Sequence, residues 1–217
     1  MGDFDEDVTY DKGNKYERQS VLALDMDILG TSDFSVLNLT AGDRLHLHDD
    51  QRARMRAIIS DGESAHSEWG FKDPRCTLTY PLWAEELPPH KIIAVFRNPA
   101  QVWPRFRWNG KRLYFTNFHR AHSYLKRWHE HNLGIADYLE KGTNDFLVIN
   151  YHELMTGDSE FQRLEAFVGR DLVDRRRLDL YRSRTSGDLF LKVAGWYLEK
   201  NTGLTCEGTL SRLEALR

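Results

Sequence analysis

The sequence of 217 residues has few of the features that mark secreted, membrane-spanning or metal-binding proteins. Its only cysteines, Cys76 and Cys206, do not form a Cys-x-x-Cys spacing, so neither a disulfide framework nor a zinc or dithiol redox centre is expected. No apolar run approaches the length that crosses a bilayer, and residues 1–7 are acidic where a signal or transit peptide is basic. We therefore expect a cytoplasmic protein with no membrane partner.

Acidic residues are absent between Leu87 and His129, although the formal net charge of the chain is −3. The same stretch contains nine basic residues, which are Lys91, Arg97, Arg105, Arg107, Lys111, Arg112, Arg120, Lys126 and Arg127. Such a local surplus suits a small, highly charged anion, while the overall charge argues against nucleic acid as a partner. A solvated basic face is the alternative for the residues on the later helix.

Two apolar stretches, 68–71 and 91–96, each end abruptly in charged residues and a proline, which is typical of buried parallel strands. Between them, residues 76–87 have apolar side chains at spacings of three and four, which predicts a crossover helix. Residues 146–151 form a third strand candidate. We therefore expect one α/β domain over residues 1–217, with a ligand at the carboxyl edge of a parallel sheet.

Apolar periodicity and capping residues predict the remaining helices. A helix over 14–29 should end at Gly30, and a second should be capped by Asp49 or Asp50 and end near Asp61 and Gly62. Further helices are expected over 99–108, shortened or kinked by Pro104, then over 116–139, 161–168, 171–181, 187–200 and 208–217.

Several motifs occur in a consistent order along the chain: 13–17, Gly-Phe-Lys-Asp-Pro-Arg at 70–75, Phe-Arg-Asn-Pro at 96–99, 128–132, and Ile-Asn-Tyr-His-Glu-Leu at 149–154. Their order and spacing resemble the bacterial sulfotransferase family, which uses 3′-phosphoadenosine 5′-phosphosulfate (PAPS). The resemblance extends over about residues 1–170. It implies a three-layer, P-loop-type parallel sheet flanked by helices, and adenosine 3′,5′-bisphosphate (PAP) as the nucleotide product.

The resemblance also implies roles for individual residues. Arg97 would hold the 3′-phosphate of the cofactor, which fits the bidentate pairing of a guanidinium with phosphate. Arg105 stands where the family has a serine partner for this arginine, and Arg75 is a further candidate cofactor-binding residue. Lys72 would stabilise charge beside the transferred sulfuryl group. Asp73 is the candidate base, although it is also suited to cap the following helix and pair with Arg75.

One element of the family pattern is missing. Family members begin with a strand and a Gly-x-x-Arg-Ser-Gly-Thr-Ser type loop that wraps the 5′-phosphosulfate, and no such loop precedes the matching residues. Residues 184–187, which begin with the candidate cofactor-binding residue Arg184, superficially echo that loop but follow no strand. The candidate Arg182, with Gly187 and Asp188, echoes the late phosphate-binding segment of cytosolic sulfotransferases, although a helix cap explains that echo equally well. We expect residues 4–10 or a partner subunit, including a second copy, to complete the sheet.

Two other residue patterns have alternative interpretations. His46 and His48, followed by two aspartates, could ligate a metal, but a polar loop before a helix is the expected reading, so we predict no metal. Aromatic residues interleaved with basic ones could stack on bases or sugars, yet at helical spacing they are more typical of a core; they are Trp103, Phe106, Trp108, Tyr114, Phe115 and Phe118.

The leading hypothesis is a sulfotransferase that transfers a sulfuryl group from PAPS to a hydroxyl or amine of a small-molecule or carbohydrate acceptor. The alternative is a catalytically inactive or truncated sulfotransferase-like nucleotide-binding protein, because the 5′-phosphosulfate loop is missing. A nucleotide kinase-like protein is a weaker possibility, since the sequence has no Gly-Lys-Ser/Thr loop.

Overall fold

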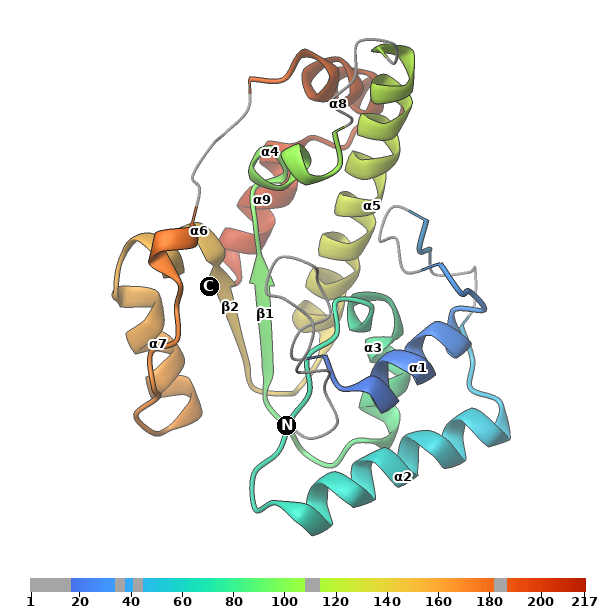
Figure 1. Ribbon diagram of the computed structural model, residues 1–217, viewed down its shortest axis with the longest axis vertical. Coiled ribbons are helices and arrows are strands. Elements are labelled where there is room, and N and C mark those ends of the chain that lie inside the picture. The colour runs from blue at the N-terminus through green and yellow to red at the C-terminus, as the bar shows by residue number, and fades with distance from the viewer. Residues whose placement is uncertain (1–16, 34–37, 41–44, 108–113, 182–186) are drawn as a thin grey trace. The chain divides into compact units, whose positions relative to one another are not determined.

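The computed structural model describes residues 17–33, 38–40, 45–107, 114–181 and 187–217 (Figure 1). It is mixed α/β and mostly helical, and it divides into two compact units, Met1–Pro89 and His90–Arg217. The single domain expected over residues 1–217 stays a prediction. Within the described residues, no helix combines the length and apolar character needed to cross a membrane.

The first unit contains three helices that pack against one another, α1 (Gln19–Ile28), α2 (Asp49–Ala65) and α3 (Cys76–Glu86). Gly30 follows α1 with φ +63°, so the predicted helix end is confirmed. Apolar residues of α1 pack against the buried Leu39 and the partly buried Leu78. Glu86 of α3 accepts hydrogen bonds from Arg52 and Arg56 of α2, which adds polar links between these helices.

The predicted ends of α2 are both wrong in detail. The helix begins at Asp49, but its N-cap is His48, whose backbone N–H donates to Gln51 Oε1 at 3.1 Å. At the other end the helix continues past Gly62 to Ala65. Gly62 is a packing position, because a Cβ built there would lie 2.4 Å from the indole ring of Trp69. The glycine therefore admits an aromatic ring and does not end the helix.

The strand predicted over 68–71 does not form. Trp69 and Phe71 stack with ring centroids 6.2 Å apart, and Phe71 packs on Trp83 of α3 at 4.7 Å. Their side chains thus find aromatic and helical partners instead of the two faces of a sheet. This corrects the predicted βαβ unit, of which the crossover helix α3 and the second strand are confirmed.

The second unit contains two parallel strands, β1 (Ile92–Phe96) and β2 (Phe146–Asn150), which confirms both as predicted. Ile92 lies opposite Phe146, and Phe96 lies opposite Asn150, so the two strands end at the same level. The connection between them contains the long helix α5 (Tyr114–Lys141). The coarse α/β class is therefore confirmed, whereas the three-layer P-loop architecture stays a prediction.

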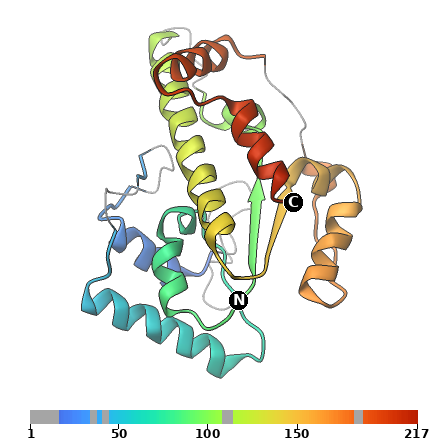
Figure 2. The ribbon, with the colours of Figure 1, turned by 180° about the vertical axis from the view of Figure 1, so that it is seen from behind.

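Helix α5 forms the apolar centre of the second unit. Its buried residues recur at helical spacing and include Ala121, Tyr124, Leu125, Trp128, Ala136 and Leu139. Two later helices pack against it, α8 (Leu189–Thr202) and α9 (Cys206–Ala215), and α9 also contacts β2. Figure 2 shows α5 running alongside the two strands, with α9 next to it.

The remaining elements are short. Pro99 begins α4 (Pro99–Val102), which passes into the 3₁₀ helix η2 (Trp103–Arg105) at Pro104, so the predicted helix over 99–108 is indeed shortened. Helix α6 (Tyr151–Thr156) directly follows β2, where only a strand was expected, and α7 (Ser159–Val168) ends at Gly169 as predicted. Of the helix predicted over 171–181, only the 3₁₀ turn η3 (Leu178–Leu180) forms.

Candidate functional site

Arg97 occupies the position directly after β1, at the carboxyl edge of the sheet. Its guanidinium carbon lies 4.2 Å from the ring centroid of Tyr151, the first residue after β2. Because Phe96 and Asn150 are register partners, the arginine and the tyrosine leave neighbouring strand ends together. Their stacking fixes the guanidinium at the edge where ligands bind in parallel sheets.

The backbone after β1 is held by α5. Trp128 Nε1 donates to the carbonyl oxygen of Arg97 at 3.0 Å, and the hydroxyl of Tyr124 donates to the carbonyl oxygen of Pro99 at 2.9 Å. The side chain of Asn98 accepts from the backbone N–H of Ala100 at 2.9 Å and so caps α4. These three contacts give the segment one defined conformation.

Arg97 is half-buried and has no carboxylate partner within the residues that the structure describes. Burial lowers the pKa of its guanidinium, and the nearby Arg105 lowers the pKa further, while Tyr151 acts in the opposite direction. The Nε atom of Arg97 is buried without a hydrogen-bond partner. Arg105 is exposed and likewise forms no ion pair among the described residues. We call Arg97 and Arg105 the cation pair.

A pocket of about 530 Å³ opens at the same edge of the sheet. The last residue of each strand contributes to its lining, and the other lining residues come from α4, α6 and α9: Asn98, Gln101, His152, Leu210 and Glu214. Ligand sites in parallel sheets lie at the carboxyl ends of the strands, which is where this pocket is found.

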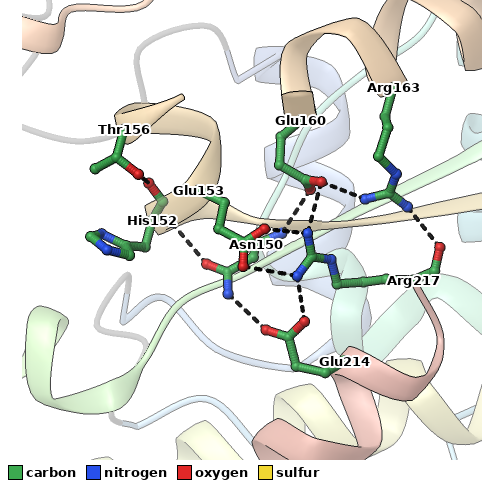
Figure 3. A network of polar contacts seen from close by, with 8 residues as sticks. All are labelled: Asn150, His152, Glu153, Thr156, Glu160, Arg163, Glu214 and Arg217. Carbon is green, nitrogen blue, oxygen red and sulfur yellow. Dashed lines mark hydrogen bonds and ion pairs between the residues drawn. The ribbon is translucent and has the colours of Figure 1, made fainter. Parts of the chain in front are cut away.

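A network of hydrogen bonds and ion pairs centred on Arg217 stabilises the wall of this pocket (Figure 3). Its guanidinium donates to Glu160 at 2.8 Å and also to Glu153 and Glu214. Glu160 is almost fully buried and accepts from the backbone N–H of Asn150 at 3.3 Å. Burial raises the pKa of Glu160, but hydrogen bonds from Arg163 and Arg217 outweigh it and hold the pKa below its usual range. The network therefore links the end of β2 to α7 and α9.

Three of the residues predicted for the site belong to the first unit. Lys72 is exposed, and its Nζ lies 2.8 Å from Glu17 Oε1. Asp73 and Arg75 are buried, with Arg75 Nη1 at 3.0 Å from Asp73 Oδ1 and 3.2 Å from Glu17 Oε2. These four residues form an acid–base cluster, Glu17, Lys72, Asp73 and Arg75. Because Lys72 and Arg97 belong to separate units, a shared site for them stays a prediction.

Within that cluster, Asp73 has the geometry expected of a structural residue. Its Oδ1 accepts from the backbone N–H of Arg75 at 2.7 Å, and both of its oxygens accept from the Arg75 guanidinium. Burial raises the pKa of Asp73, and the hydrogen bonds from Arg75 partly oppose that shift. A role as base stays a prediction, as does cofactor binding by Arg75.

Sequence reasoning missed a buried carboxylate in the first unit, Asp25 of α1. It accepts hydrogen bonds from Thr79 Oγ1 and Trp83 Nε1, both at 2.8 Å, and from Cys76 Sγ at 3.2 Å. Burial raises its pKa to about 6 despite these three donors. The available signal was one acidic residue inside the apolar stretch 21–26 of a predicted helix.

The other candidates separate into core residues and residues outside the described part. Trp103 is fully buried beside Tyr124, with ring centroids 5.6 Å apart, as the core interpretation of the aromatic residues predicts. His48 caps α2, and no cluster of three metal-ligating side chains occurs among the residues described. Arg182 and Arg184 lie outside the described residues, so their predicted cofactor contacts stay predictions.

Comparisons of the chain with protein-family models, curated proteins and solved structures found no match.

Proposed function

We propose that this chain is a sulfotransferase-type domain that recognises the 3′-phosphate of PAPS or PAP with Arg97 and Arg105. The reaction would transfer the sulfuryl group of PAPS to a hydroxyl or amine of a small-molecule or carbohydrate acceptor. The observation that carries the proposal is the cation pair after β1, which lacks a carboxylate partner among the described residues although other arginines of the unit have one.

The residues present fit the 3′-phosphate. A half-buried guanidinium without a counter-ion is stabilised more by a bound anion than an exposed one is, because burial has already weakened its hydration. The buried, unpartnered Nε of Arg97 provides a donor, and the backbone contacts from Trp128 and Tyr124 keep it in place. Arg105 would add a second charge-assisted bond.

PAPS would supply the sulfuryl group, and the chain would supply position and charge. Arg97 would fix the nucleotide by its 3′-phosphate, and Lys72 would place a cation near the leaving oxygen. Lys72 lies beside the buried Glu17, so this carboxylate would orient the lysine while leaving it exposed to a ligand. A hydroxyl acceptor also needs a base to take its proton.

A second candidate is a sulfotransferase-like nucleotide-binding protein without catalysis. The geometry of Asp73 favours it, because both oxygens of this carboxylate are engaged by Arg75 and its side chain is fully buried. In this case the cation pair would bind PAP or PAPS, and no transfer would follow.

Calorimetric titration of the full chain with PAP tests the recognition that both candidates share. Adenosine 5′-monophosphate is the matched ligand that lacks the 3′-phosphate. Arg97→Ala should weaken PAP binding roughly 10- to 100-fold, the equivalent of one lost charged hydrogen-bonded contact. Its far-ultraviolet circular dichroism should be unchanged.

Lys126→Ala is the control variant, because it removes the same charge from an exposed position of the same basic stretch. It should bind PAP as the unchanged chain does. Equal affinities for PAP and adenosine 5′-monophosphate, or an unaltered affinity in Arg97→Ala, would contradict the proposed site. Release of PAP from PAPS in the presence of a pool of hydroxyl acceptors would then separate the enzyme from the binding protein.

A further inference from the structure

The polar groups that line the pocket at the strand ends form only some of their possible hydrogen bonds within the described residues. Asn150 Nδ2 donates to Glu214 Oε1 at 2.7 Å, and Asn150 Oδ1 accepts from the backbone N–H of His152 at 2.9 Å (Figure 3). The other oxygen of Glu214 accepts from Arg217. These contacts link two walls of the pocket, and Arg217 compensates the charge of Glu214 only in part, because the same guanidinium also pairs with Glu153 and Glu160.

Three further lining groups have no hydrogen-bond partner within the described residues. They are the Nδ2 amide of Asn98, the side-chain amide of Gln101 and the Nε2 atom of His152. His152 is oriented by its other ring nitrogen, Nδ1, which lies 2.6 Å from the hydroxyl oxygen of Tyr181. The pocket therefore presents both donors and acceptors from α4 with its N-cap and from α6.

The chemistry of the lining selects among ligand classes. A second anion is disfavoured, because Glu214 is the ionised group of the lining. A stacked nucleobase is disfavoured too, since Phe96 is only 4% exposed and so offers little surface for stacking. A hydroxyl group both donates and accepts, so several hydroxyls on one small ring match amides and an imidazole well.

We propose that this pocket binds a neutral, hydroxyl-rich ligand, a sugar or a related cyclic polyol. Identifying that ligand with the sulfuryl acceptor rests on the proposed function, because the pocket and Arg97 share the carboxyl edge of the sheet. Binding of the polyol does not rest on it. The pocket also uses α9, which lies beyond the stretch where the sequence resembles sulfotransferases.

The test is a nuclear magnetic resonance titration of the ¹⁵N-labelled full chain with glucose, N-acetylglucosamine and inositol, each measured separately. Ligands of this size bind with dissociation constants of millimolar order. At least one of them should produce saturable shifts in the side-chain amide signals of Asn98, Gln101 and Asn150. Gln101→Met keeps the length of the side chain and removes its amide, so it should weaken binding at least several-fold.

Gln162→Met, at an exposed position of α7, is the matched control and should bind as the unchanged chain does. Adenosine is the rival probe, and saturable shifts of the same signals with adenosine alone would overturn the inference in favour of a nucleoside subsite. Absence of shifts with all three polyols would overturn it as well. A PAP titration on the same sample keeps the two proposals separate, because PAP binding without polyol binding contradicts only this inference, and the reverse contradicts only the proposed function.

Discussion

Arg217 Nη2 lies 2.8 Å from Glu160 Oε1, and the Glu160 side chain is only 1% exposed. An ion pair of this kind is most important when one partner is removed, because the remaining charge stays buried, and without Arg217 only Arg163 would compensate Glu160. Here the remaining charge also accepts from the backbone of Asn150 at the end of β2. The geometry of the strand end therefore depends on a residue of the chain 67 positions later.

Arg217→Ala should destabilise the second unit by roughly 2 kcal/mol, less than the usual cost of leaving a buried charge unpaired, because Arg163 still pairs with Glu160 at 2.6 Å. Denaturant unfolding measures the loss, and hydrogen exchange of a peptide over 146–168 should show faster exchange at the end of β2. Exchange in the first unit should not change.

Arg212→Ala is the matched comparison, because Arg212 also binds two carboxylates, those of Asp137 and Glu140, but both are solvent-exposed. We expect a loss of at most about 1 kcal/mol from this variant. Equal losses from the two variants would show that burial of Glu160 does not determine the stability of the network.

Asp25 should give the first unit an unusual pH dependence. Its pKa in the folded chain is raised from 3.8 to about 6, so the folded state binds a proton that the unfolded state releases over this interval. The associated stability is fully present below about pH 4 and is lost as the pH rises through about 6, a change of roughly 3 kcal/mol. Asp25→Asn should remove this loss, which unfolding free energies measured across the interval will show.

In the second unit, the pH dependence of stability that Glu160 contributes has the opposite sign. Its folded-state pKa is held below its usual range, so the associated stability is present above the ordinary glutamate pKa and is lost as the pH falls through the lowered value. Hydrogen exchange resolved by unit separates the two effects. A first unit that does not lose stability between pH 4 and 6 would refute the assignment of a raised pKa to Asp25.

Gly62→Ala should destabilise the first unit although alanine favours a helix. The added Cβ would lie 2.4 Å from the Trp69 ring, and overpacking of this kind costs about 1–3 kcal/mol. Gly195→Ala in α8 is the comparison, since its Cβ would meet only Leu125 Cδ1, at an ordinary 3.7 Å. That variant should gain up to about 1 kcal/mol from helix propensity. Thermal unfolding of both variants checks the two signs, and stabilisation by both would contradict the packing seen at Trp69.

Asp73→Asn separates a structural from a catalytic role for this carboxylate. A structural role predicts a loss of about 2 kcal/mol of stability, since a charged acceptor of the buried Arg75 is removed. A role as base predicts loss of sulfuryl transfer with PAP affinity and unfolding free energy unchanged. Asp61→Asn, at an exposed position of α2, is the control and should alter none of the three.

The sequence predicted elements well where one local pattern determined them. Both strands of the sheet, helix α3 and the ends of α1 and α7 at Gly30 and Gly169 follow from apolar runs, periodicity and the glycine φ values. The strand predicted over 68–71 was wrong because two aromatic residues flanking a glycine fit two structures equally well. They can lie in a strand, or they can lie in an irregular segment that packs on helices, as they do here. Only tertiary contact distinguishes those cases.

The candidate site divides in the same way. The sequence predicted that Arg97 follows a strand. It could not predict that Arg97 stacks on Tyr151, because that contact depends on the register of β1 and β2. The network of Arg217 was not readable, because its carboxylates come from three helices that are separated along the chain. Long-range charge pairing leaves no local pattern.

The parallel pairing of β1 with β2 also has a consequence for how the chain acquires its structure during synthesis. Parallel strands need a long crossover, and here the strand partner of Phe96 follows it by more than fifty positions, with α5 in between. At ribosomal rates of about 5–20 residues per second, β1 is synthesised several seconds before β2, and during that time it has no strand partner. Ile93 and Val95, which remain about half exposed even in the folded chain, are then open to other strands or to chaperones.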